Sequence, residues 1–165
     1  MIDNSQICTT IEQSERLLAL GLKKETADMV YRSFGYIIDE FGNKERRFKQ
    51  PTMVVEGWES KYDIPAWSLH RLWELLPKSI WHDNGLEKKY HPIIEYGFVN
   101  YVAECGMELF DFDCGYDVWR SMIVVIEWLI KEGYFPKEYL VNQTEIEEHC
   151  KGVLEYLDYI RGEEE

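Results

Sequence analysis

The chain has 165 residues, of which 45% are hydrophobic and 15% aromatic, and its formal net charge is -13. This length and composition fit one folded domain and exclude a chain that stays disordered for lack of apolar residues. The last 65 positions hold 16 acidic residues and only five basic ones, so this end disfavours phosphate backbones and favours a cationic partner.

The first predicted element is a helix over residues 10–20, because Thr10 opens a capping box and Gly21 follows as a stop. Apolar residues at helical spacing over 27–34 predict a second, shorter helix. A helical hairpin that packs on the core accounts for both segments, although a DNA-reading alternative exists. The spacing of a helix-turn-helix is matched by Leu17, Gly21 and Ala27.

Short strands are predicted at 36–38 and 53–55, where β-branched residues gather. The charged stretch 43–47 between them predicts a long loop or an irregular hairpin. Its basic cluster can bind an acidic ligand, but we expect a solvated loop tip. The next element is a helix over 66–76, with Pro65 in its first turn and an apolar stripe along one side.

Residues 93–103 and 107–112 predict an antiparallel hairpin that turns at 105–106. Asp111 and Asp113 lie one residue apart on the second strand, so their carboxylates point the same way and can share a cation. No third ligand accompanies them. We therefore expect Asp113 to cap the helix that follows.

That helix, over 117–132, is apolar around most of its circumference and leaves a narrow polar stripe that includes Ser121. A last helix is predicted over 144–160, where a capping box precedes an apolar seam. The seam either docks on the core or pairs with the same helix of a second subunit, and docking is favoured because the seam is short. The outer face of this helix carries Glu145, Glu148, Glu155 and Asp158.

No segment predicts a membrane span or a signal peptide, since the longest apolar run covers only 122–126. We therefore expect a soluble, cytoplasmic protein with no membrane partner. The four cysteines form no CxxC pair and are expected to be reduced thiols. The four histidines share no ligand spacing with them or with one another, so we expect no metal and no cofactor.

Several helix-forming segments, taken in order, resemble a group of small uncharacterised proteins associated with phages and mobile elements of gut anaerobes. The resemblance covers most of the ordered chain but includes no catalytic residues. It implies a cytoplasmic accessory role in a mobile element or its host. The segments that carry it are residues 12–22, 25–29, 65–69, 75–77 and 127–129.

Together these elements predict the α+β class, with a small antiparallel sheet packed against several amphipathic helices. The sheet includes 93–112, and the acidic helix 144–160 lies outside it. We expect a single domain over 1–162 and a short acidic tail over 163–165.

The leading hypothesis for function is a non-enzymatic interaction protein, because the acidic third is prominent and no catalytic motif is present. In its sharper form the protein is a nucleic-acid mimic that binds a basic host protein and does not bind nucleic acid directly. The mimicking carboxylates are Glu145, Glu148, Glu155 and Asp158. The alternative is a small-ligand binder or enzyme with a pocket near Asp111, Asp113, His82 and His91.

Overall fold

The structure is a computed structural model that describes residues 6–55, 61–83, 87–111 and 117–142. Helices and three small antiparallel sheets confirm the predicted α+β class. The contacts divide the chain into two compact units, Met1–Arg71 with Leu140–Glu165, and Leu72–Tyr139. The single domain over 1–162 stays a prediction. The predicted helix 144–160 and the tail 163–165 lie outside the described residues.

The first unit begins with α1 (Ile11–Ala19), which confirms the predicted helix near 10–20. Its capping box is formed, because Gln13 N–H donates to Thr10 Oγ1 over 3.1 Å and Thr10 N–H donates to Gln13 Oε1 over 3.0 Å. These bonds satisfy two amide groups that a helix start leaves without partners. Gly21 follows with a φ of 95°, a conformation that glycine adopts without strain.

The predicted second helix over 27–34 is wrong, and the helix-turn-helix alternative falls with it. A short 3-10 turn, η1 (Lys24–Thr26), leads into β1 (Met29–Tyr31). This strand pairs on one side with β4 (Thr52–Met53) and on the other with β5 (Ile64–Ala66). Helical spacing of apolar residues is a weak signal over so few positions, and pairing with distant strands decides the conformation.

The predicted helix over 66–76 starts later than expected, because α2 spans Leu69–Leu75 and follows the strand β5. Pro65 therefore lies in a strand and not in a first helical turn. The sheet order β4-β1-β5 leaves β5 at an edge, where a residue without an N–H group is tolerated. The boundary between the two units falls within α2, after Arg71.

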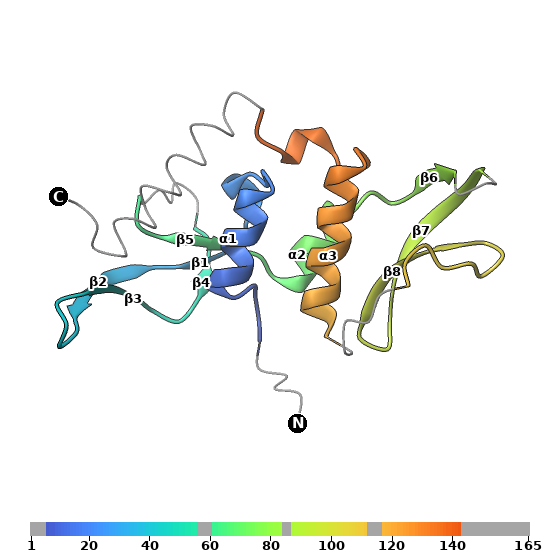
Figure 1. The fold of residues 1–165 in the computed structure, drawn as a ribbon. Coiled ribbons are helices and arrows are strands. Elements are labelled where there is room, and N and C mark those ends of the chain that lie inside the picture. Colours follow the sequence, from blue (N-terminus) through green and yellow to red (C-terminus); the bar gives the residue numbers. More distant parts are fainter. Residues whose placement is uncertain (1–5, 56–60, 84–86, 112–116, 143–165) are drawn as a thin grey trace. The chain divides into compact units, whose positions relative to one another are not determined.

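The charged stretch at 43–47 lies almost wholly in one strand of a hairpin, which is one of the two predicted forms, so the expected solvated loop tip is wrong. β2 (Ser33–Ile38) pairs with β3 (Lys44–Phe48), and Figure 1 shows the pair extending away from β1, β4 and β5. In the connecting turn, Asp39 Oδ1 accepts the N–H groups of Phe41 and Asn43. Hydrogen bonds from Asn43, first from its side chain, lower the pKa of Asp39. The predicted strand at 36–38 is confirmed, whereas of the strand predicted at 53–55 only Met53 lies in one, β4 (Thr52–Met53).

The interior of the first unit is organised around Trp67, which is fully buried. Its backbone N–H donates to Thr9 Oγ1 over 3.0 Å, and its C=O accepts the Thr9 N–H over 2.9 Å. The indole N–H donates to Thr26 Oγ1 over 2.9 Å. Tyr31 Oη donates to Thr9 O, so the same site also holds β1. These bonds connect the segment before α1, η1, β1 and the start of α2.

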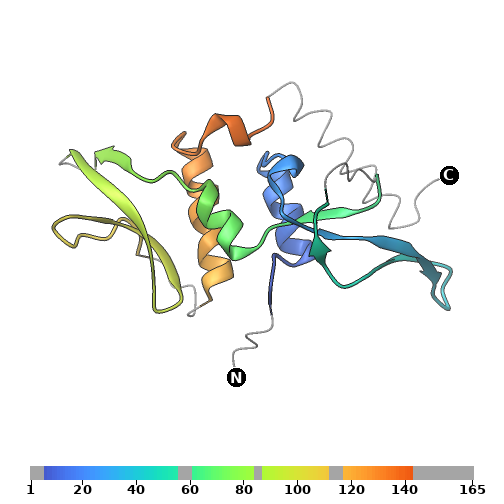
Figure 2. The ribbon, with the colours of Figure 1, turned by 180° about the vertical axis from the view of Figure 1, so that it is seen from behind.

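In the second unit, β7 (Glu87–Glu95) lies between β6 (Ile80–Asp83) and β8 (Phe98–Ala103), as Figure 2 also shows. The predicted single strand over 93–103 is wrong, because the chain turns at Tyr96 and Gly97, which have φ values of 50° and 81°. The predicted turn at 105–106 is present as a second turn, after which Glu108 bridges back to Val102.

The long apolar helix is confirmed as α3 (Val118–Lys131). It begins at Asp117, whose Oδ1 accepts the N–H groups of Trp119 and Arg120. The predicted cap, Asp113, is not the N-cap and lies outside the described residues. The sequence places Ser121 in the polar stripe of this helix, but the structure buries it fully. Its hydroxyl accepts the Val99 N–H over 2.8 Å and donates to Val99 O over 3.2 Å.

The remaining described element is the 3-10 turn η2 (Lys137–Tyr139). Beyond it the chain returns to the first unit, where Leu140 bridges to Leu22 and Val141 N–H donates to Gly21 O. Within the described ranges, no helix has the length and apolar character that crossing a membrane requires.

We expect Thr26→Val to lower the free energy of unfolding by about 1–3 kcal/mol, because the buried indole N–H of Trp67 then lacks an acceptor. In a Trp67→Phe background the same change should cost less, since no indole N–H remains. Urea denaturation followed by far-UV circular dichroism measures both differences. Thr52→Val, at an exposed position of β4, is the control. Equal costs of Thr26→Val in the two backgrounds would contradict the assigned bond.

Candidate functional site

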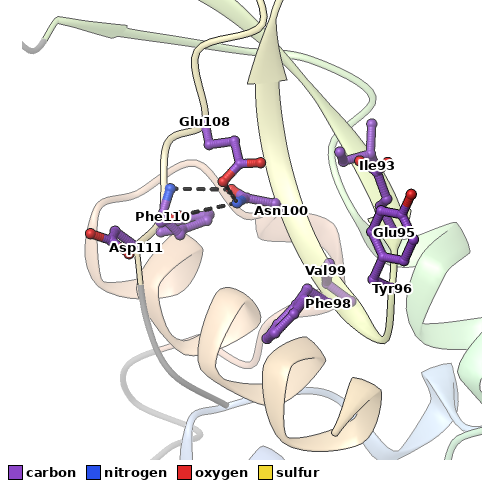
Figure 3. A pocket seen from close by; sticks show the side chains of 9 residues that line it. All are labelled: Ile93, Glu95, Tyr96, Phe98, Val99, Asn100, Glu108, Phe110 and Asp111. Atoms are coloured by element: carbon purple, nitrogen blue, oxygen red, sulfur yellow. Dashed lines mark hydrogen bonds between the residues drawn. The ribbon is translucent and has the colours of Figure 1, made fainter. Parts of the chain in front are cut away.

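The second unit contains an open pocket of about 450 Å³ beside the turn between β7 and β8. Three carboxylates line it, those of Glu95, Glu108 and Asp111, together with aromatic and aliphatic side chains. Figure 3 shows Glu95 and Asp111 on opposite sides of the pocket, with Asn100 between them. The carboxylates therefore do not converge on one point.

The Asn100 side chain forms one wall of this pocket and makes hydrogen bonds of the kind that a neighbouring strand would make (Figure 3). Its Oδ1 accepts the Phe110 N–H over 3.1 Å, and its Nδ2 donates to Phe110 O over 3.1 Å. Nδ2 also donates to Glu108 Oε2 over 3.3 Å. The side chain thereby satisfies backbone groups that would otherwise need a strand partner, and it holds residues 108–111 against β8.

The structure does not bring the predicted pocket residues together. His82 on β6 pairs with Lys88 on β7, so these two side chains lie on the same face of the sheet. His91 is also on β7, three positions after Lys88. Side chains three positions apart along a strand point to opposite faces, so His91 lies on the face opposite to Lys88 and therefore opposite to His82. His82 Nδ1 lies 3.0 Å from Tyr134 Oη, and His91 Nδ1 lies 3.1 Å from Lys78 O. Neither histidine lines the pocket.

Of the predicted pocket residues, Asp111 alone lines the cavity, and Asp113 lies outside the described residues. Within 6–55, 61–83, 87–111 and 117–142, no three His, Cys, Asp or Glu side chains form a group that could hold a metal ion. Carboxylates beside aromatic rings suit an organic cation and repel phosphate. The pocket therefore offers binding chemistry for a cation.

A second candidate site is the exposed face of the β2–β3 hairpin, whose basic cluster the sequence interpretation set aside as a solvated loop tip. Tyr36 pairs with Arg46, and Ile38 pairs with Lys44, so all four side chains lie on one side of the ribbon. We call these four residues, with Tyr62 beside them, the hairpin face. Tyr36 and Ile38 are 51% and 61% exposed. The apolar run 36–38 next to the charged run 43–47 could have indicated such a face, but the charges were interpreted as a loop.

Cations of the hairpin face lie over its aromatic rings. Lys44 Nζ is 5.4 Å from the centre of the Tyr36 ring, and the Arg46 guanidinium is 4.3 Å from that of Tyr62. Arg46 Nη1 also donates to Ser33 Oγ over 2.8 Å. Such cation–π contacts contribute roughly 0.5–1 kcal/mol at exposed sites, so they order the side chains without covering the aliphatic groups. In Figure 1 the helix of the first unit, α1, does not lie against this hairpin.

The predicted partner-binding residues lie outside the residues that the structure describes. They are Glu145, Glu148, Glu155 and Asp158.

Two thiols of the described residues differ sharply in chemistry. Cys8 is buried, and burial raises its pKa. Cys105 is exposed at the second turn of the β8 region, and a hydrogen bond from the backbone of Met107 lowers its pKa, with help from the charge of Lys88. A lowered pKa gives more thiolate at neutral pH, and the thiolate is the reactive form.

We expect iodoacetamide to alkylate Cys105 rapidly at neutral pH and to leave Cys8 unmodified until the protein unfolds. Peptide mass spectrometry of a time course measures the two rates separately. Lys88→Met should slow the reaction of Cys105 at neutral pH, because the cation that stabilises the thiolate is lost. Equal rates for Cys105 and Cys8 in the folded protein would show that burial and charge do not control these thiols.

Comparisons with known proteins found no match: no family model, no curated protein and no solved structure is similar to this chain at the level required. The candidate sites for function are therefore the two surfaces described above. One is the carboxylate-lined pocket of the second unit, and the other is the hairpin face of the first unit.

Proposed function

We propose that the protein is a cytoplasmic, non-enzymatic interaction protein that acts as an accessory of a mobile element or its host. The observation that carries this proposal is the hairpin face, where apolar side chains are exposed on an ordered two-stranded ribbon. Phe34, at 58% exposed, and Phe41, at 81%, add to the apolar surface of the same hairpin. A contiguous exposed apolar surface on a folded protein marks an interaction site.

The energetics of the hairpin support an interaction role. An isolated two-stranded hairpin is marginally stable in water, because one pair of strands buries little apolar surface. Among the strands that the structure describes, β2 and β3 pair only with each other. A partner that covers the hairpin face would bury Tyr36 and Ile38 and would supply the missing packing. Burial of apolar area contributes roughly 25 cal/mol per Å².

The sharper proposal is that the acidic end of the chain mimics nucleic acid and binds a basic host protein. It is supported by the sequence, in which the last 65 residues carry 16 acidic and five basic residues. Carboxylates spaced along one face of an amphipathic segment can imitate a row of phosphates approximately. In this proposal the acidic end and the hairpin face serve two separate contacts.

The alternative proposal is a small-ligand binder or enzyme that uses the pocket of the second unit. The observation that favours it is the 450 Å³ cavity that Asp111 helps to line. Because its charged groups are carboxylates, the ligand would be a cation. The hairpin face favours the interaction role over this alternative, since the pocket is open and its carboxylates do not converge.

We expect the double variant Tyr36→Ser and Ile38→Ser to lose a partner that the wild-type chain captures from a lysate of its host cells, with at least about a tenfold drop in recovery. Quantitative mass spectrometry of the eluates measures recovery. Trp81→Ser changes a side chain of similar exposure, 56%, in the other unit and is the matched control. Undiminished recovery with the double variant would exclude the hairpin face as the binding surface.

For mimicry, we expect neutralisation of the four carboxylates Glu145→Gln, Glu148→Gln, Glu155→Gln and Asp158→Asn to abolish capture of a basic partner that rising salt releases. A second quadruple variant changes net charge equally at exposed positions elsewhere and should bind normally. It combines Glu12→Gln, Glu25→Gln, Glu104→Gln and Glu132→Gln. Unchanged binding by the variant with the four neutralised carboxylates would contradict the mimic proposal.

A further inference from the structure

We propose that the hairpin face binds an amphipathic segment of a partner protein in which apolar side chains lie beside carboxylates. This inference deepens the proposed interaction function and rests on it. The geometry of the paired strands is its first support. Tyr36 and Ile38 form an apolar column on β2, and their partners Arg46 and Lys44 form a cationic column on β3. A complementary segment therefore needs an apolar column next to an acidic one.

The local charge of the hairpin supports an acidic partner. Residues 32–49 contain five cationic and three acidic side chains, whereas the rest of the chain contains 13 and 28. The hairpin is thus a basic region on an acidic protein. At physiological ionic strength charges farther apart than about 8 Å are largely screened, so the cations of the hairpin itself control what approaches it. A segment whose charges are all basic would meet an excess of like charge there.

The rings of the hairpin face favour a protein segment over nucleic acid. Bases of single strands stack on open aromatic faces. The rings of Tyr36 and Tyr62 are instead occupied by Lys44 and Arg46, and Tyr62 also has Lys61 Nζ at 5.7 Å. The exposed aliphatic group of Ile38 offers no stacking surface.

The charges at the tip of the hairpin also favour a protein segment over nucleic acid. Asp39 and Glu40 flank the exposed ring of Phe41 at the turn, and hydrogen bonds keep the pKa of Asp39 low, so its carboxylate stays ionised at neutral pH. Two anionic groups at the tip repel a phosphate backbone. A protein segment can place a neutral or basic side chain opposite them, so one surface accommodates both the tip and the cationic column.

The test measures fluorescence anisotropy of labelled probes with the full-length chain. The main probe is a peptide of alternating leucine and glutamate. Comparison probes are alternating serine and glutamate, alternating leucine and lysine, and an oligothymidylate. We expect the leucine–glutamate peptide to bind best, and its affinity to fall as salt rises. Ile38→Ser and Lys44→Glu should each weaken that binding by about tenfold or more.

Matched controls separate the hairpin face from general effects of exposure and charge. Met53→Ser removes an apolar side chain that is 64% exposed on β4, close to the 61% of Ile38. Lys137→Glu reverses an exposed cation in the other unit. Both variants should bind the leucine–glutamate peptide as the wild-type chain does. Equal losses with these controls would overturn the assignment to the hairpin face.

The remaining outcomes each decide against the proposal in a different way. Equal binding of the serine–glutamate peptide would show that charge alone acts, and tighter binding of oligothymidylate would assign the surface to nucleic acid. Binding that emerges only after Glu145, Glu148, Glu155 and Asp158 are neutralised would assign the surface to the chain's own acidic end. Binding by no probe at about 1 mM, with a lysate partner still lost in the Tyr36 and Ile38 double variant, would overturn this partner chemistry and leave the interaction function standing.

Discussion

Trp67 is the residue on which the order of the first unit depends. Its ring is excluded from water, and its polar groups are satisfied by Thr9 and Thr26, which come from two other segments. A buried polar group without a partner costs about 1–3 kcal/mol, so displacing any one of these segments leaves another group unpaired. The chain before α1, η1, and the junction of β5 with α2 must therefore be placed together.

The hairpin follows from this arrangement because β1 continues directly into β2. Pairing with β4 and β5 uses both sides of β1, and Tyr31 is anchored to Thr9. Beyond Arg32 the strand leaves this sheet, and among the described residues it pairs with β3 alone. Tyr36 and Ile38 are consequently exposed, and so is Lys44 beside them, whereas Arg46 is half-buried against Tyr62. The surface proposed to bind is the part of the first unit that its own core does not cover.

In the second unit, two side chains continue the hydrogen bonding along β8 beyond the backbone bonds that this strand makes with Met107 and Leu109. Ser121 satisfies both backbone groups of Val99 from α3, and Asn100 satisfies both backbone groups of Phe110. Each bond removes the need for a continuous fourth strand. Asn100 thereby holds residues 108–111 beside β8, where Glu108, Phe110 and Asp111 line the carboxylate-lined pocket. Polar side chains thus control the shape of this surface, although the bulk of the unit is apolar.

The sequence by itself determined the α+β class, the capped helix α1, the long helix α3 and the excess of acid at one end, because local capping, helical periodicity and charge do not depend on distant contacts. Only the tertiary structure decided that 29–31 and 64–66 are strands, since pairing between distant segments overrides a weak local pattern. The tertiary structure also decided that His82 and His91 lie apart from the pocket that Asp111 lines. It placed the basic stretch near Arg46 beside an apolar column, because strand register sets which side chains share a face.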